Sequence, residues 1–203
     1  GPSIYLLGYA DNDTDEYDRG VVQHEFAHYL EHQLGRTESI GGSHSTLSRL
    51  DMRVAFGEAW GNAFSGMVSG DPLYRDSLSE DQSRGFTINL KQRNTAAQGW
   101  FNEASIQAFL YELYGDPDSD GDQLQLGFKP IYDVLTSERY LNFDGFASVY
   151  AFRAELETQR PHLADTLTQM LWRYKITGSG WYGEGPTAGT ACAPTPPGPP
   201  GPL

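Results

Sequence analysis

The chain has 203 residues, with 27 Asp or Glu against 14 Lys or Arg, which gives a formal net charge of −13 at pH 7. So acidic a chain would be repelled by phosphate groups, which argues against nucleic acid as a partner. The single cysteine, Cys192, excludes an intrachain disulfide, and no apolar run reaches the ~18 residues that a membrane-spanning helix needs. The length suits one domain with its own core, and we expect a monomer.

The first residues, Gly1-Pro2-Ser3, resemble the remnant of a protease cleavage site. Residues 4–8 form a candidate strand at the edge of a cleft, and we expect the chain to be the catalytic piece of a longer protein. Five acidic residues follow closely on this strand: Asp11, Asp13, Asp15, Glu16 and Asp18. They could bind calcium or form a solvated loop whose last carboxylates favour a helix N-terminus. The cluster has no glycine at the turn position, which favours the loop.

Residues 21–34 are predicted to form a helix that carries the string His24-Glu25-Phe26-Ala27-His28. Residues four apart lie on one face of a helix, so His24 and His28 can bind a single metal ion. Glu25 lies beside them, where it can act on a metal-bound water. The apolar residues of the stretch share another face, which we expect to pack on the core, with the histidines on the opposite side: Val22, Phe26, Tyr29 and Leu30.

A second helix is predicted over residues 47–68, and it is mostly apolar and therefore buried. A polar stripe runs along it: Asp51, Glu58, Asn62 and Ser65. A buried carboxylate needs a partner, because an unpaired buried charge is expensive. A catalytic zinc ion usually takes three protein ligands and a water, so Glu58 is the candidate third ligand. Asn62, one turn later, could accept a hydrogen bond from the free ring N–H of a ligating histidine.

The combination of His24-Glu25-x-x-His28 with a glutamate on a second helix resembles the gluzincins, the thermolysin-like zinc peptidases. The segment Gly57-Glu58-Ala59-Trp60 is most similar to the fungalysin branch, and residues 39–67 resemble a group of bacterial secreted peptidases. The similarity covers residues 21–67 well and the remainder only vaguely. One position departs from the family pattern, because Asn62 stands where an aspartate is expected. An amide can still accept the bond but carries no charge, so the ligating histidine would be less polarised.

The resemblance implies a zinc-dependent endopeptidase that acts on proteins or peptides and is secreted, periplasmic or held at the cell surface. Zinc would be bound by His24, His28 and Glu58, and would lower the pKa of a bound water to about 7. Glu25 would take a proton from that water and pass it to the leaving amine.

A second donor should stabilise the oxyanion that forms during hydrolysis. The candidates are a histidine in the glycine-rich loop between the two helices and several tyrosines: His44, Tyr132, Tyr111 and Tyr140. Relatives of thermolysin use a downstream histidine for this role, but His162 reads here as a solvated helix end. We expect His32 to be an exposed helix residue.

Further helices are predicted over residues 102–114, 146–159 and 162–174. The expected fold is therefore mainly α with a small β remnant: a zincin-like catalytic domain over residues 1–183, with an active-site helix, a glutamate-ligand helix and a C-terminal helical subdomain. Residues 184–203 are rich in proline and glycine, which is typical of an extended linker.

A second acidic segment matches the first half of an EF-hand loop, with Asp116, Asp118, Asp120 and Asp122 as candidate calcium ligands. Gly127 occupies the position where a bidentate glutamate belongs, so the choice is between a looser calcium site and a plain acidic turn. Two alternatives to an enzyme remain: a zinc- or calcium-binding, catalytically weak binding or adhesion module on a gluzincin scaffold, and a structural calcium module in which the histidines are incidental.

Overall fold

The structure, a computed structural model, describes residues 3–10, 12–92, 97–115 and 124–184. It is mainly helical, as predicted, with one small antiparallel sheet of strand order β1-β2-β3-β4. The main helices are α1 (Arg19–Leu34), α2 (Met52–Ser69), α3 (Glu103–Tyr114), α4 (Phe128–Leu135), α5 (Glu138–Leu141), α6 (Val149–Gln159) and α7 (Ala164–Arg173). The strands are β1 (Gly8–Tyr9), β2 (Asp13–Thr14), β3 (Leu73–Leu78) and β4 (Arg84–Asn89).

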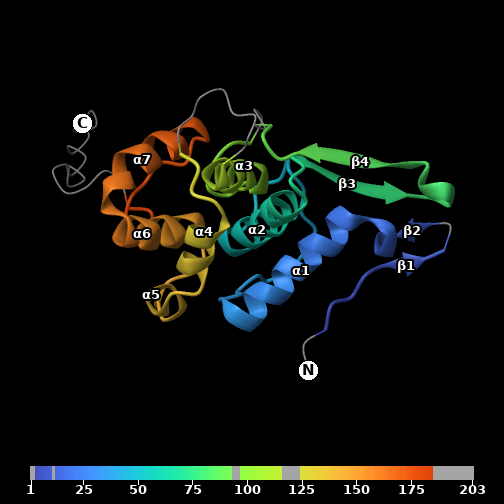
Figure 1. The fold of residues 1–203 in the computed structure, drawn as a ribbon, viewed down its shortest axis with the longest axis horizontal. Coiled ribbons are helices and arrows are strands. Elements are labelled where there is room, and N and C mark those ends of the chain that lie inside the picture. Colours follow the sequence, from blue (N-terminus) through green and yellow to red (C-terminus); the bar gives the residue numbers. More distant parts are fainter. Residues whose placement is uncertain (1–2, 11, 93–96, 116–123, 185–203) are drawn as a thin grey trace, which may run out of the picture.

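Helix α2 forms the centre of the molecule, between α1 on one side and α3 on the other (Figure 1). Every residue from Val54 to Met67 is buried, as its nearly continuous apolar sequence predicts. The helix begins at Asp51, whose side chain accepts a hydrogen bond from the backbone N–H of Arg53. It ends before Gly70, whose φ of 64° lies in the left-handed region that glycine adopts without strain. The ends of this helix are therefore fixed by sequence signals of its own.

Helix α1 buries most deeply the face that was predicted to be polar, although Leu30 from the predicted apolar face still packs against the core. Its buried residues are Val21, His24, Ala27 and Glu31. Phe26, predicted to point into the core, is 42% exposed and stacks on Tyr29. The reason is that His24 and His28 pair with Glu58 on α2, while Glu31 pairs with His28 one turn earlier on α1, so burying these groups leaves no unpaired charge.

The sheet was not predicted beyond one strand, which was placed over residues 4–8, whereas β1 covers only Gly8–Tyr9. Its main part is a hairpin of β3 and β4, in which Tyr74 pairs with Ile88 and Asp76 with Phe86. The Asp18 side chain accepts hydrogen bonds from the backbone N–H and hydroxyl of Ser77, which ties the start of α1 to β3. The hairpin is thereby held beside the histidine helix.

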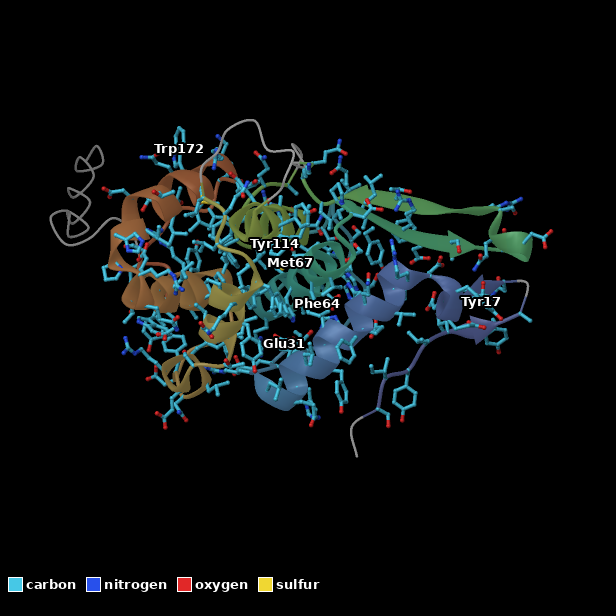
Figure 2. The ribbon with its side chains drawn as sticks, in the orientation of Figure 1. Tyr17, Glu31, Phe64, Met67, Tyr114 and Trp172 are labelled. Atoms are coloured by element: carbon cyan, nitrogen blue, oxygen red, sulfur yellow. The ribbon has the colours of Figure 1, made fainter. Side chains whose placement is uncertain are left out.

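The C-terminal helices α4 to α7 pack together at the other end of the molecule (Figure 1). Helices α6 and α7 confirm the predicted helical pair, separated by a short 3₁₀ turn over Pro161–Leu163, while α4 and α5 were not predicted. Figure 2 shows Phe64 and Met67 in the interior, and Trp172 and Tyr17 at the periphery. The predicted linker lies outside the described residues, apart from Glu184. Among the described helices, none combines the length and hydrophobicity needed to cross a bilayer.

Candidate metal centre

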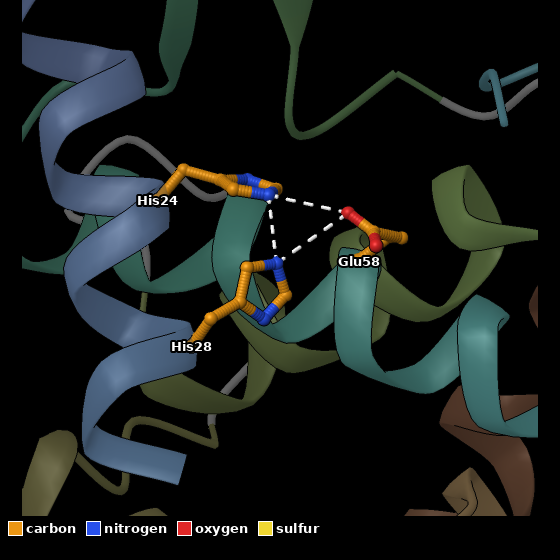
Figure 3. A group of neighbouring side chains, drawn as sticks. All are labelled: His24, His28 and Glu58. Atoms are coloured by element: carbon orange, nitrogen blue, oxygen red, sulfur yellow. Dashed lines mark hydrogen bonds and ion pairs between the residues drawn. The ribbon is translucent and has the colours of Figure 1, made fainter. Parts of the chain in front are cut away.

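His24 and His28 on α1 converge with Glu58 on α2 (Figure 3). The Glu58 Oε2 atom lies 3.2 Å from His24 Nε2 and 3.5 Å from His28 Nε2, and the two Nε2 atoms are 3.0 Å apart. A tetrahedral zinc ion with bonds of ~2.0–2.1 Å holds its ligand atoms about 3.3 Å from one another. The three side chains therefore have the spacing and the chemistry of a metal site.

A glycine on α2 makes room for the first of these ligands. A Cβ atom added at Gly61 would lie 2.6 Å from Cε1 and 2.7 Å from Nδ1 of the His24 ring. Real Cβ atoms do not approach so closely, and an imidazole packed between two helices cannot easily move away. Gly61 therefore lets the His24 ring lie directly against the α2 backbone. This glycine lies one position before Asn62 and one turn before Ser65.

Both histidines contact a polar side chain through their other ring nitrogen. His24 Nδ1 lies 2.9 Å from Asn62 Oδ1, as predicted, and Asn62 Nδ2 in turn donates to Gln107 Oε1 on α3. His28 Nδ1 lies 3.7 Å from Glu31 Oε2, a contact that was not predicted. Partners of this kind fix the orientation of ligating imidazoles. The Nε2 atoms are thus left facing Glu58.

The charges around the site favour a cation. Burial disfavours the charged forms of both Glu58 and His28, but the pairing between them outweighs it. Hydrogen bonds with His24 and His28 hold the pKa of Glu58 well below its ordinary value. Hydrogen bonds with Glu31 and Glu58 raise the pKa of His28 to about 10. The carboxylates that stabilise this proton would equally stabilise a divalent metal, which has to displace the proton in order to bind.

A cleft of about 750 Å³ opens over the three ligands, and Glu25 lines it beside them. Glu25 follows His24 on α1, so the turn of the helix places its carboxylate next to the ligands rather than among them. Within the described part of the chain, no hydrogen bond or ion pair occupies this carboxylate. A free carboxylate beside a metal site is the arrangement that a general base requires.

His44 reaches the same cleft from the loop between α1 and α2. Its Nε2 lies 3.3 Å from Glu58 Oε2, and its Nδ1 lies 3.0 Å from Glu103 Oε2. Glu103 is buried at the first turn of α3, so it does more than support the helix dipole. Its hydrogen bond is the main reason that the pKa of His44 is raised. The loop histidine is therefore held in place over the ligands by α3.

The other candidate donors lie elsewhere. Tyr132 is the one that needs correction, because it lines a separate apolar groove with Leu30, Trp60 and Phe128. Its position on α4, a helix that was not predicted, takes it away from the cleft. Three more residues are also outside the cleft lining: Tyr111 and Tyr140, which are buried in the core, and the exposed His162. His32 is exposed on α1, as expected.

The hairpin supplies one wall of the cleft, and sequence reasoning missed it. Tyr74, Phe86 and Ile88 line the cleft from β3 and β4, and the Tyr74 ring lies 6.0 Å from the His24 ring in an edge-on arrangement. Phe86 stacks on Tyr74 and remains 49% exposed. The register makes these residues share one face, because Tyr74 pairs with Ile88. The alternation of apolar and polar residues over 86–90 was the signal that could have revealed β4.

A second group of acidic side chains reaches the same cleft, which Asp15 and Asp76 help to line. One oxygen each from Asp13, Asp15 and Asp76 lies within 4.8 Å of the others, a spacing that could hold a cation. Burial and the neighbouring Asp13 raise the pKa of Asp15 to about 6. Of the remaining acidic residues in the predicted cluster, Asp18 binds Ser77 and Glu16 is exposed.

The second predicted calcium site lies outside the described residues, with all four of its candidate ligands: Asp116, Asp118, Asp120 and Asp122. Asp11 of the first acidic cluster also lies outside them.

Comparison with known proteins adds no family assignment. No protein-family model, no curated protein and no solved structure matches the chain. The candidate site therefore has to be interpreted from its own geometry.

Proposed function

We propose that the protein is a zinc-dependent endopeptidase. One observation carries this proposal: the His24, His28 and Glu58 ligand atoms converge, and the Glu25 carboxylate lies free in the same cleft. Two imidazoles and one carboxylate suit zinc, and three protein ligands leave a position for water or substrate. Zinc held there would supply a Lewis acid that acidifies water and polarises a carbonyl group.

The protein's own residues would perform the proton transfers. Glu25 would take a proton from the attacking water and give it to the amine that leaves. When both of its ring nitrogens are protonated, His44 would donate a hydrogen bond through Nε2 to the oxygen of the carbonyl under attack. The hydrogen bond between Glu103 and Nδ1 favours this charged form by raising the pKa of His44. The wall formed by Tyr74, Phe86 and Ile88 would accept an apolar side chain of an extended peptide.

Replacing Glu25 by Gln tests the assignment. We expect cleavage of an unfolded protein substrate to fall about 10²–10⁴-fold, the usual contribution of a general base, while the zinc content stays near that of the parent. The matched control is Glu138→Gln, an exposed glutamate on α5, which should cleave like the parent. If Glu25→Gln cleaves as fast as the parent, Glu25 is not the base.

A zinc-binding module without strong catalysis is the second candidate, and one observation favours it. Asn62 is neutral, so it polarises His24 less than a carboxylate would. This candidate predicts stoichiometric zinc in the parent but no cleavage by either the parent or Asn62→Asp. Cleavage that increases in Asn62→Asp would instead show an enzyme limited by its neutral partner.

A further inference from the structure

Behind the metal ligands, a chain of hydrogen bonds runs from α3 through α2 to α1. Asn62 Nδ2 donates to Gln107 Oε1 over 2.9 Å, and Asn62 Oδ1 lies 2.9 Å from His24 Nδ1. All three side chains are buried, with Gln107 at 0% exposure. Water does not compete for these bonds, so each group depends on its neighbour in the chain.

The direction of this chain determines which nitrogen of His24 carries the proton. The Gln107 Oε1 atom can only accept, so the Asn62 NH₂ group must face it. Asn62 therefore turns its oxygen toward His24, and His24 Nδ1 must be the donor. The proton then sits on Nδ1, and Nε2 keeps the lone pair that a metal needs.

The same side chains could be joined in the reverse direction. If both amides were turned over, Gln107 would donate to Asn62, Asn62 would donate to His24 Nδ1, and the imidazole proton would move to Nε2. That proton would point at Glu58 Oε2, which lies 3.2 Å away, and would block the metal position. In the structure Gln107 takes part in the chain through its oxygen, which accepts from Asn62, while within the described residues its Nε2 has no hydrogen-bond partner. The acceptor of Gln107 is therefore the group that sets the observed direction.

We propose that Gln107 is a positioning residue of the metal centre, which acts through Asn62 to keep His24 in the tautomer that can bind the metal. The proposal rests on the zinc site proposed above. It assigns a second role to α3, because Gln107 follows Glu103 by one helical turn, and Glu103 holds His44. One face of α3 thus orients two imidazoles of the site.

Two substitutions at Gln107 separate this role from simple packing. Gln107→Met keeps the size but removes the acceptor, so we expect zinc to bind about 10-fold more weakly, at the lower end of the usual effect of such partners. Gln107→Glu offers only acceptor oxygens and cannot reverse the chain, so zinc affinity should stay at or above that of the parent. Gln33→Met, an exposed change on α1, is the matched control. Chelator competition measures the affinities, and circular dichroism confirms that each variant is folded.

The effect of Gln107→Glu on zinc affinity should change sign when Asn62 is replaced by a carboxylate. In Asn62→Asp, the new side chain accepts from His24 by itself and needs a donor from Gln107, which the free Nε2 can supply. Adding Gln107→Glu to Asn62→Asp would place two carboxylates together and should weaken zinc binding, although Gln107→Glu alone does not. A purely structural role for Gln107 predicts no such change of sign.

The tautomer can also be read directly, without metal. Long-range ¹H–¹⁵N spectra of the metal-free protein should show His24 protonated on Nδ1 in the parent and in Gln107→Glu, with more Nε2 protonation in Gln107→Met. Parent-like zinc affinity in Gln107→Met, or equal losses in both Gln107 variants, would overturn the proposal. Normal zinc binding without any cleavage would instead count against the peptidase function and leave the role of Gln107 standing.

Discussion

Two groups of potential metal ligands lie along one cleft, and they are built differently. His24, His28 and Glu58 belong to two long helices, and the histidines contact further side chains that orient them. The group of Asp13, Asp15 and Asp76 comes from short elements, and one oxygen each of Asp13 and Asp76 is buried with no hydrogen-bond partner among the residues that the structure describes. Geometry that is fixed before binding favours a tight site, and mixed nitrogen and oxygen ligands favour zinc over calcium. The contrast predicts a strong zinc site and no comparable affinity at the aspartates.

Among substitutions outside the ligands and the base, the largest expected effect on zinc affinity comes from filling the space beside His24. Gly61→Ala should weaken zinc binding by about 100-fold, because the added methyl group displaces the imidazole and such shifts around a metal cost this much. Gly57→Ala, one turn earlier on α2, is the matched control, since its Cβ would meet nothing closer than 3.9 Å. It should keep its affinity and gain about 0.5–1 kcal/mol from helix propensity. Equal zinc affinity in the two variants would show that the His24 ring does not depend on this contact.

Zinc should also stabilise the fold through the histidine group alone. At a free zinc concentration 1,000 times the dissociation constant, the free energy of unfolding rises by about 4.1 kcal/mol. Urea unfolding with and without zinc should show this increase in the parent and in Asp76→Asn, but not in Glu58→Gln, which lacks the ligand charge. An increase that survives in Glu58→Gln and disappears in Asp76→Asn would transfer the zinc site to the aspartates.

The histidine group was predictable because each of its parts has a local signal. Four-residue spacing on one helix brings His24 and His28 together, and a carboxylate in an apolar helix marks Glu58 as needing a partner. The packing face of α1 was predicted wrongly, because apolar periodicity ignores polar groups that are paired across a helix interface. Gln107 was missed for the same reason, since only the packing of α3 on α2 reveals its contact with Asn62. Glu31 follows His28 by three residues on α1, so its contact had a local signal that was overlooked.

The aspartate group shows the opposite limit of sequence reasoning. Asp13 and Asp15 were noticed as part of an acidic run, but Asp76 joins them only through the pairing of β2 with β3. Pairing between strands so far apart in the chain depends on tertiary packing, which no local pattern specifies. Tyr132 was misplaced for a related reason, because α4 was not predicted. Residues linked by a spacing within one helix could thus be placed, whereas contacts between elements could not.

The smallest effect concerns the carboxyl group of Asp15, whose charged form is disfavoured by burial and by the neighbouring Asp13. The pKa of Asp15 is raised from 3.8 to about 6, so the folded state binds more protons than the unfolded state between these values, and stability falls as the pH rises through them. Asp15→Asn removes this loss. A shift of this size corresponds to about 3 kcal/mol for a fully buried group, but Asp15 is partly exposed and screening reduces the gain to about 1 kcal/mol.

Urea unfolding in calcium-free buffer can measure this gain. Asp15→Asn should be more stable than the parent at pH 7.5, and this advantage should nearly vanish at pH 3.5, where the carboxyl group is mostly protonated in both states. Asp165→Asn, an exposed change on α7, controls for the lost charge. If the aspartates bind a cation, calcium added at pH 7.5 should reduce the difference in free energy of unfolding between Asp15→Asn and the parent. If they bind none, the difference should stay the same. If the difference in free energy of unfolding between Asp15→Asn and the parent is equal at both pH values, Asp15 titrates normally. The histidine group and the aspartate group would then differ in the type of their ligands but not in electrostatic strain.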